Sequence, residues 1–104
     1  MYAVIGTWDV PGSRQDHIDG LTSNVIPFIR TLPGFVSARF ARAVDGGSNY
    51  SYLVFTDRES AERFVSVSAP SRERVQAEAG VARKADFVVV DVLADVPADA
   101  GVPA

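Results

Sequence analysis

His17 is the chain's only histidine, and histidine is the side chain that ordinarily titrates near neutral pH. Ser13, followed three residues later by Asp16, is typical of a helix start, so we expect His17 in the first turn of a helix. The helix N-terminus disfavours an imidazolium, and a neutral imidazole there can accept a proton from an acidic phenol or an activated C–H group. A partly exposed histidine without a role is the more ordinary interpretation.

Trp8 is a candidate wall for a planar ligand. It shares one face of the first expected strand with Gly6, which would leave a gap beside the indole. Asn24 and Phe28 are expected beside His17, at the edge of the apolar side of the same helix, and would complete a substrate-binding surface. The alternative is a core tryptophan that fills the space left by the glycine.

Tyr50 and Tyr52 lie two residues apart, and therefore on one face of a strand, where their phenol groups could hydrogen-bond a carbonyl or enolate oxygen. Arg39 faces the same way as Ser37 and could hold an anionic oxygen. Tyrosines packed beneath a helix and an arginine near a sheet edge are equally ordinary. The candidates for catalysis are thus His17, Tyr50, Tyr52 and Arg39, and those for substrate binding are Trp8, Asn24 and Phe28.

The composition excludes several other classes of site. A net charge of −3 and a pI near 4.9 offer no positive field for nucleic acid or an anionic membrane. The absence of cysteine excludes disulfides, thiolate metal sites and iron–sulfur clusters, and a single histidine argues against a zinc site. Gly46-Gly47 is typical of a hairpin turn and does not form a dinucleotide-binding loop, so we expect no metal and no cofactor. Without a signal or a spanning run, we expect a cytoplasmic protein.

These candidates need strands and helices to position them, and the hydrophobic period predicts both. The strand 35–44 should place Val36, Ala38, Phe40 and Arg42 on one face and Phe35, Ser37, Arg39 and Ala41 on the other. We predict the order strand, helix, strand, strand, helix, strand over residues 2–10, 14–32, 35–44, 49–56, 57–69 and 87–96, with another helical turn or two within 71–79.

The helix ends follow from prolines and capping residues. Pro27 should kink the first helix, and Pro33-Gly34 should end it. Thr56 with Glu59 three residues later predicts a capping box for the second helix, which Pro70 should interrupt. We expect a single domain over 1–96 and a flexible tail over 97–104.

This order predicts an α+β, ferredoxin-like fold, in which both helices cover one face of a four-stranded antiparallel sheet. The other face would then meet water, yet strands one, three and four are apolar on both sides. Such a patch exceeds what soluble monomers usually expose. We therefore expect a homodimer in which two sheets pack face to face; the alternative is that loops and the tail cover the face.

Four short motifs resemble the antibiotic biosynthesis monooxygenase-like proteins of the dimeric α/β-barrel superfamily, and the resemblance extends over about residues 2–96. The motifs are Asp9-Val10-Pro11-Gly12, Leu32-Pro33-Gly34-Phe35, Ser37-Ala38-Arg39-Phe40 and Thr56-Asp57-Arg58-Glu59-Ser60.

The resemblance implies a dimeric α/β barrel with a cavity between sheet and helices in each half. Family members include cofactor-independent oxygenases of aromatic polyketides, haem-degrading enzymes, and relatives that isomerise or cyclise reactive carbonyl compounds. This chain has Arg58 where the family commonly has tryptophan. It also lacks a histidine in its second helical region, which disfavours haem.

Our first hypothesis is a cofactor-independent monooxygenase that deprotonates a small aromatic or polyketide-like substrate and lets the carbanion react with dioxygen. One alternative is a cyclase or isomerase that uses the same cavity without oxygen. The other is a non-enzymatic small-molecule-binding dimer, in which Trp8 and the tyrosines pack the pocket shut.

Overall fold

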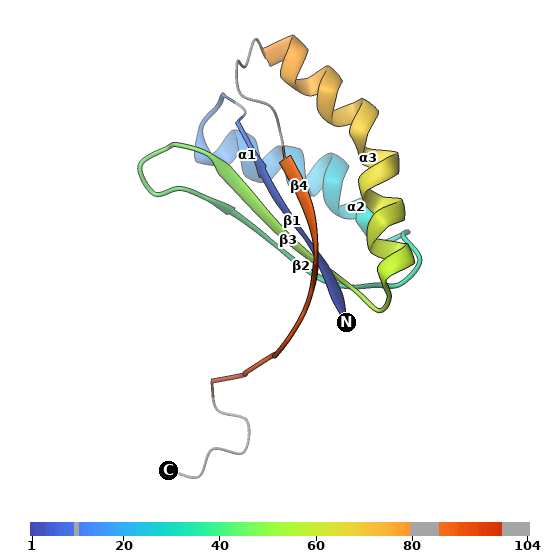
Figure 1. Ribbon diagram of the computed structural model, residues 1–104. Coiled ribbons are helices and arrows are strands. Elements are labelled where there is room, and N and C mark those ends of the chain that lie inside the picture. The colour runs from blue at the N-terminus through green and yellow to red at the C-terminus, as the bar shows by residue number, and fades with distance from the viewer. Residues whose placement is uncertain (10, 80–85, 99–104) are drawn as a thin grey trace.

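The computed structural model of the chain describes residues 1–9, 11–79 and 86–98 (Figure 1). Its four strands form one antiparallel sheet in the order β2-β3-β1-β4, which confirms the predicted ferredoxin-like topology. The elements are β1 (Tyr2–Trp8), α1 (Arg14–Gly20), η1 (Leu21–Val25), α2 (Ile26–Ile29), β2 (Phe35–Arg42), β3 (Asn49–Phe55), α3 (Arg58–Ala79) and β4 (Asp86–Asp91).

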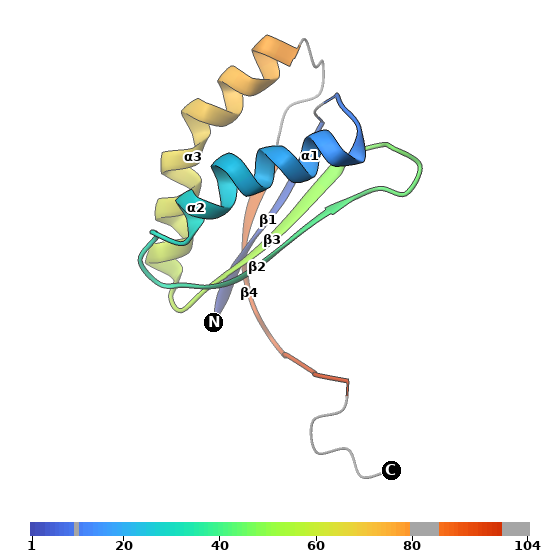
Figure 2. The same ribbon diagram turned by 180° about the vertical axis from the view of Figure 1, so that it is seen from behind.

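The helices all lie on one face of the sheet, as Figures 1 and 2 show from opposite sides. Val4, Leu53 and Phe55 project from the sheet into this layer and are almost fully buried. The helices contribute Ile29 from α2 and, from α3, the buried Ala61 and Phe64. The core therefore forms where α2 and the start of α3 cross the strands.

The first helical region is three segments where we predicted one kinked helix. Between α1 and α2, η1 is a π-helical stretch in which the N–H of Ile26 bonds to the carbonyl of Leu21, five residues back. Pro27 follows at once, and the wider turn relieves the clash between a proline ring and the preceding turn. The extra residue shifts the helical phase: Ile29 is buried, whereas Phe28, expected on the buried side, is 44% exposed.

The start of α3 differs from the prediction by one residue. Asp57, not Thr56, caps it: the N–H of Ser60 donates to Oδ1 of Asp57 at 2.8 Å, and the Thr56 hydroxyl donates to Oδ2 at 3.1 Å. The hydrogen bond from the Ser60 N–H, above all, holds the pKa of Asp57 below its ordinary value.

Other boundaries also differ. The helix α3 continues to Ala79, so Pro70 does not interrupt it; within a 22-residue helix the single lost backbone bond is tolerated. The last strand ends at Asp91 and not at residue 96. Residues 10 and 99–104, which belong to the first predicted strand and to the predicted tail, lie outside the described residues.

A bulge in β2 changes the predicted alternation. The register shifts between Phe35 and Ser37, so Phe35 pairs with Phe55 and packs edge-on against it, with ring centroids 6.1 Å apart. The prediction that Phe35 shares a face with Arg39 is therefore wrong, because the bulge adds one residue to the strand.

The face of the sheet away from the helices exposes apolar side chains on β1, β3 and β4, as expected. Ile5, Tyr52 and Val88 lie side by side in the register of β3, β1 and β4, and are 40%, 39% and 54% exposed. We call this surface the open face. The predicted homodimer would cover it and stays a prediction. Within the described ranges, no helix combines the length and apolar content that crossing a bilayer requires.

Candidate functional site

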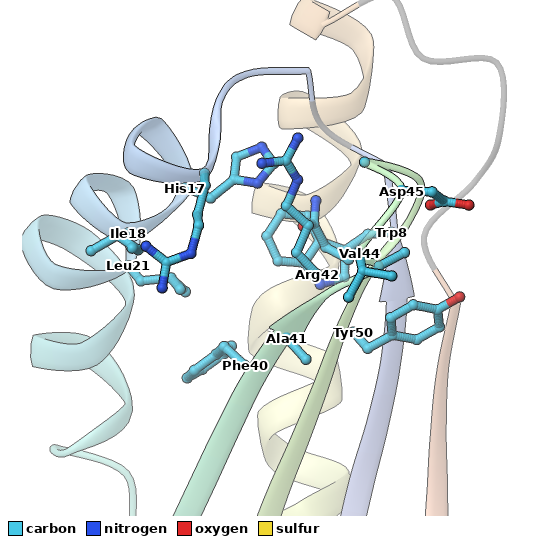
Figure 3. Close-up of a pocket in the computed structure, with 14 residues that line it drawn as sticks. Trp8, His17, Ile18, Leu21, Phe40, Ala41, Arg42, Val44, Asp45 and Tyr50 are labelled. Atoms are coloured by element: carbon cyan, nitrogen blue, oxygen red, sulfur yellow. The ribbon is translucent and has the colours of Figure 1, made fainter.

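A pocket of about 640 Å³ lies at the end of the sheet near the first turn of α1 (Figure 3). Its walls come from the start of α1 and from the loop that joins β2 to β3, and its floor comes from the last residues of β1 and β2 and the first residues of β3. Segments distant in the sequence thus enclose one space.

The floor of the pocket is one row of side chains across the sheet. Trp8 pairs with Asn49, and Asn49 in turn pairs with Arg42. Because alternate residues share a face, this row lies on the same side as the core residues Val4 and Leu53. An indole, an amide and a guanidinium therefore stand next to one another; we call these three residues the polar row.

Two members of the polar row carry unused hydrogen-bond donors. Asn49 is only 4% exposed, and its Nδ2 has no hydrogen-bond partner in the part of the chain that the structure describes. Nε of Arg42 is likewise buried without a partner, while Nη2 donates to the carbonyl of Gly12 at 3.4 Å. Buried donors are paired in most proteins, so two neighbouring exceptions on a pocket floor call for an explanation.

The helix α1 places Arg14 and His17 over the pocket. The predicted capping box is present: Asp16 N–H donates to the hydroxyl of Ser13 at 3.1 Å, and Ser13 N–H donates to Oδ2 of Asp16 at 2.9 Å. The Ser13 N–H is the main reason that the pKa of Asp16 lies below its ordinary value. Because this box fixes the first turn, it also fixes the backbone of His17.

Three of the predicted site residues come together. Trp8, His17 and Tyr50 all line the pocket, although Figure 3 shows the Tyr50 hydroxyl turned away from His17. Tyr50 therefore lies at the rim of the pocket.

The other predicted residues do not line it. Tyr52 and Arg39 pair with each other across β3 and β2, on the open face, so they cannot reach a ligand in this pocket of the same chain. Asn24 and Phe28 are exposed on η1 and α2, outside the pocket lining. The roles proposed for all seven residues stay predictions.

The gap expected beside Gly6 is filled. A Cβ on Gly6 would lie 2.5 Å from Cε1 of Phe87, whose ring packs against Phe64 with centroids 5.6 Å apart. The glycine thus makes room for an aromatic side chain of the neighbouring strand and not for a ligand. Any stacking on Trp8 must use the space of the pocket itself.

Arg42, Asn49 and Arg14 line the pocket but were not among the predicted site residues. A signal was available for two of them: Arg42 and Asn49 flank the predicted hairpin turn, which makes them cross-strand neighbours. Arg42 was also predicted on the face of Ala38 and Phe40. Among the described residues, no group of histidine and carboxylate side chains could hold a metal ion.

Searches with family models and among curated proteins found no match for this chain. Solved structures do match. A monooxygenase from the ActVA-Orf6 gene of Streptomyces coelicolor, in complex with nanaomycin D, is 22% identical with a TM-score of 0.69, over 92% of this chain and 90% of that one. SnoaB of Streptomyces nogalater, a cofactor-independent oxygenase, is 16% identical with a TM-score of 0.64, over 92% and 96%.

A third structure binds a different ligand. MhuD, solved with manganese protoporphyrin IX, is 17% identical with a TM-score of 0.63, over 93% of this chain and 99% of that one. In this chain Arg58, where the family commonly has tryptophan, forms an ion pair with Glu62 at 2.6 Å on the exposed side of α3. The resemblance predicted from the sequence is confirmed at the level of structure: the chain has the fold of the antibiotic biosynthesis monooxygenase-like proteins.

Proposed function

We propose that this protein is a cofactor-independent monooxygenase that acts on a small aromatic or polyketide-like molecule. The observation that carries the proposal is the pocket, in which the chain's only imidazole and an indole line a space of about 640 Å³. Two proteins of the same fold support it, since one is a cofactor-independent oxygenase and the other was solved with nanaomycin D.

In the proposed reaction, His17 takes a proton from an activated C–H group of the substrate. The resulting carbanion gives electrons to dioxygen, and a C–O bond forms as a hydroperoxide once the proton returns. The same carbon must carry a second hydrogen: loss of that proton and cleavage of the O–O bond release water and leave a carbonyl group on the carbon. One oxygen atom thus enters the product and the other leaves as water, so no further reductant is needed.

The open pocket also bears on the alternatives. A binding protein whose site is packed shut by Trp8 and the tyrosines is disfavoured, because both Trp8 and Tyr50 border empty space. A cyclase or isomerase would use the same pocket and would not need oxygen.

We propose a homodimer as the working form, with the open faces of two chains in contact. Ile5, Tyr52 and Val88 would then be buried, as apolar side chains of two packed sheets usually are.

An oxygen electrode tests the reaction. With a hydroxyanthrone, the protein should raise oxygen consumption above the rate without protein, and His17→Ala should lower it by roughly 100-fold, as expected for loss of a general base. Ser23→Ala, an exposed change on η1, is the matched control and should keep the rate. An unchanged rate of oxygen consumption in His17→Ala would contradict the mechanism. Substrate turnover that persists without oxygen would favour the cyclase or isomerase.

A further inference from the structure

The polar row is rich in hydrogen-bond donors and poor in acceptors. Among the described residues, Nδ2 of Asn49 and Nε of Arg42 have no hydrogen-bond partner, and Nη2 of Arg42 donates to the carbonyl of Gly12 over a long 3.4 Å. Leaving such donors buried is costly, and the cost disappears when a bound molecule supplies the acceptor oxygens. The donors thus indicate what a ligand must bring.

The charges around the pocket also favour a ligand that carries negatively charged acceptor oxygens. Of the described residues that line it, Arg14 and Arg42 are basic and Asp45 alone is acidic. The Oδ1 atom of Asp45 already accepts the N–H of Gly47 at 2.9 Å within the hairpin turn. The ion pairs found in the described part of the chain run along α3, so neither pocket arginine takes part in one.

We propose that Arg42 and Asn49 bind the carboxylate of a planar aromatic acid. A carboxylate has two oxygens that only accept, which matches the paired donors along the Nε edge of a guanidinium, and the amide of Asn49 adds a third donor. Trp8 stands at the other end of the same row and offers an aromatic surface to the ring that carries the acid. The proposal rests on the proposed function only in placing the substrate in the same pocket.

Binding of naphthoate and of naphthamide tests this by titration calorimetry, without oxygen or turnover. The two molecules share the ring system and differ in the acid group. Naphthoate should bind more tightly than naphthamide, and Arg42→Met should weaken naphthoate roughly tenfold or more with little effect on naphthamide. Arg30→Met removes an exposed arginine outside the pocket and should change neither affinity.

A second variant keeps the test decisive if Arg42→Met fails to fold. Asn49→Asp keeps the size of the side chain and puts a carboxylate beside Arg42, so the protein itself would supply the missing acceptor. Its melting temperature should match or exceed that of the wild type, while its affinity for naphthoate should fall by roughly tenfold or more. Naphthamide should still bind.

Each outcome decides the proposal. Equal affinity for the two molecules, no detectable binding of naphthoate, or naphthoate binding that survives both variants would overturn it. Acid-dependent binding together with no oxygen consumption would leave this site in place and remove only the proposed oxygenase. Failure of the carboxylate site and failure of the proposed oxygenase activity are therefore distinguishable.

Discussion

The covered face of the sheet has two ends that differ sharply. At one end, which we call the core end, Val4, Leu53 and Phe55 are almost fully buried beneath α2 and α3. At the other, the pocket end, the polar row continues the same alternation but meets a space of about 640 Å³. The strands are continuous between the ends, so the difference lies in how the helices cover them. One face can thus provide both the core and a binding site.

The largest effect is expected at the core end. Phe55→Ala removes a fully buried ring that packs against Phe35 and Phe64, and should lower the free energy of unfolding by about 3–5 kcal/mol. Urea denaturation measures it. Phe28→Ala, at a 44% exposed phenylalanine, should cost less than about 1 kcal/mol. Similar losses for both would contradict the placement of the core.

A substitution on the open face tests whether the proposed dimer forms there and whether the pocket of one chain binds its ligand without the dimer. Ile5→Lys puts a charge into the proposed dimer contact and should weaken the dimer at least roughly 100-fold, as sedimentation would measure. Ser23→Lys, on the exposed side of η1, should leave the dimer intact. Naphthoate affinity should survive in the Ile5 variant, because the residues paired with Ile5 in the strand register, Tyr52 and Val88, do not line the pocket. A variant that stays dimeric would refute the proposed contact.

The smallest expected effect concerns one capping carboxylate at each end, Asp57 of α3 and Asp16 of α1. Both have a pKa below the ordinary 3.8, so each stabilises the fold fully above pH 3.8. This contribution is lost as the pH falls through the lower folded-state pKa. Urea unfolding between pH 5 and pH 2 should show the loss. Asp57→Asn and Asp16→Asn should each reduce the dependence of the unfolding free energy on pH in this range. An unchanged pH dependence in both variants would exclude these caps as its source.

The topology could be predicted because prolines, glycines and capping residues mark where most of the elements begin and end. The prediction that Tyr50 and Tyr52 share a face of β3 and the predicted helix start at Ser13 are both confirmed. The bulge after Phe35 was not predicted, since no glycine or proline within the strand indicates it. The choice of Asp57 over Thr56 as the cap was missed because the two adjacent residues carry similar acceptors.

The site was harder to predict than the fold. Trp8, His17 and Tyr50 were identified by residue type, and all three line the pocket. Arg42 and Asn49 were missed as site residues. They become a candidate site only because the strand register makes them neighbours and the helices leave a pocket above them. Local patterns specify which face a residue takes, but the position of a pocket depends on tertiary packing.

The π-helical turn of η1 lets one stretch of chain meet two separate requirements. Because the turn inserts a residue, α1 is rotated about the helix axis relative to the position that an uninterrupted α-helix would give it. Ile29 can keep its place in the core while substitutions in α1 alter what His17 and Arg14 present to a ligand. The residues that face the pocket can therefore vary at one end of the helical region without any repacking at the other.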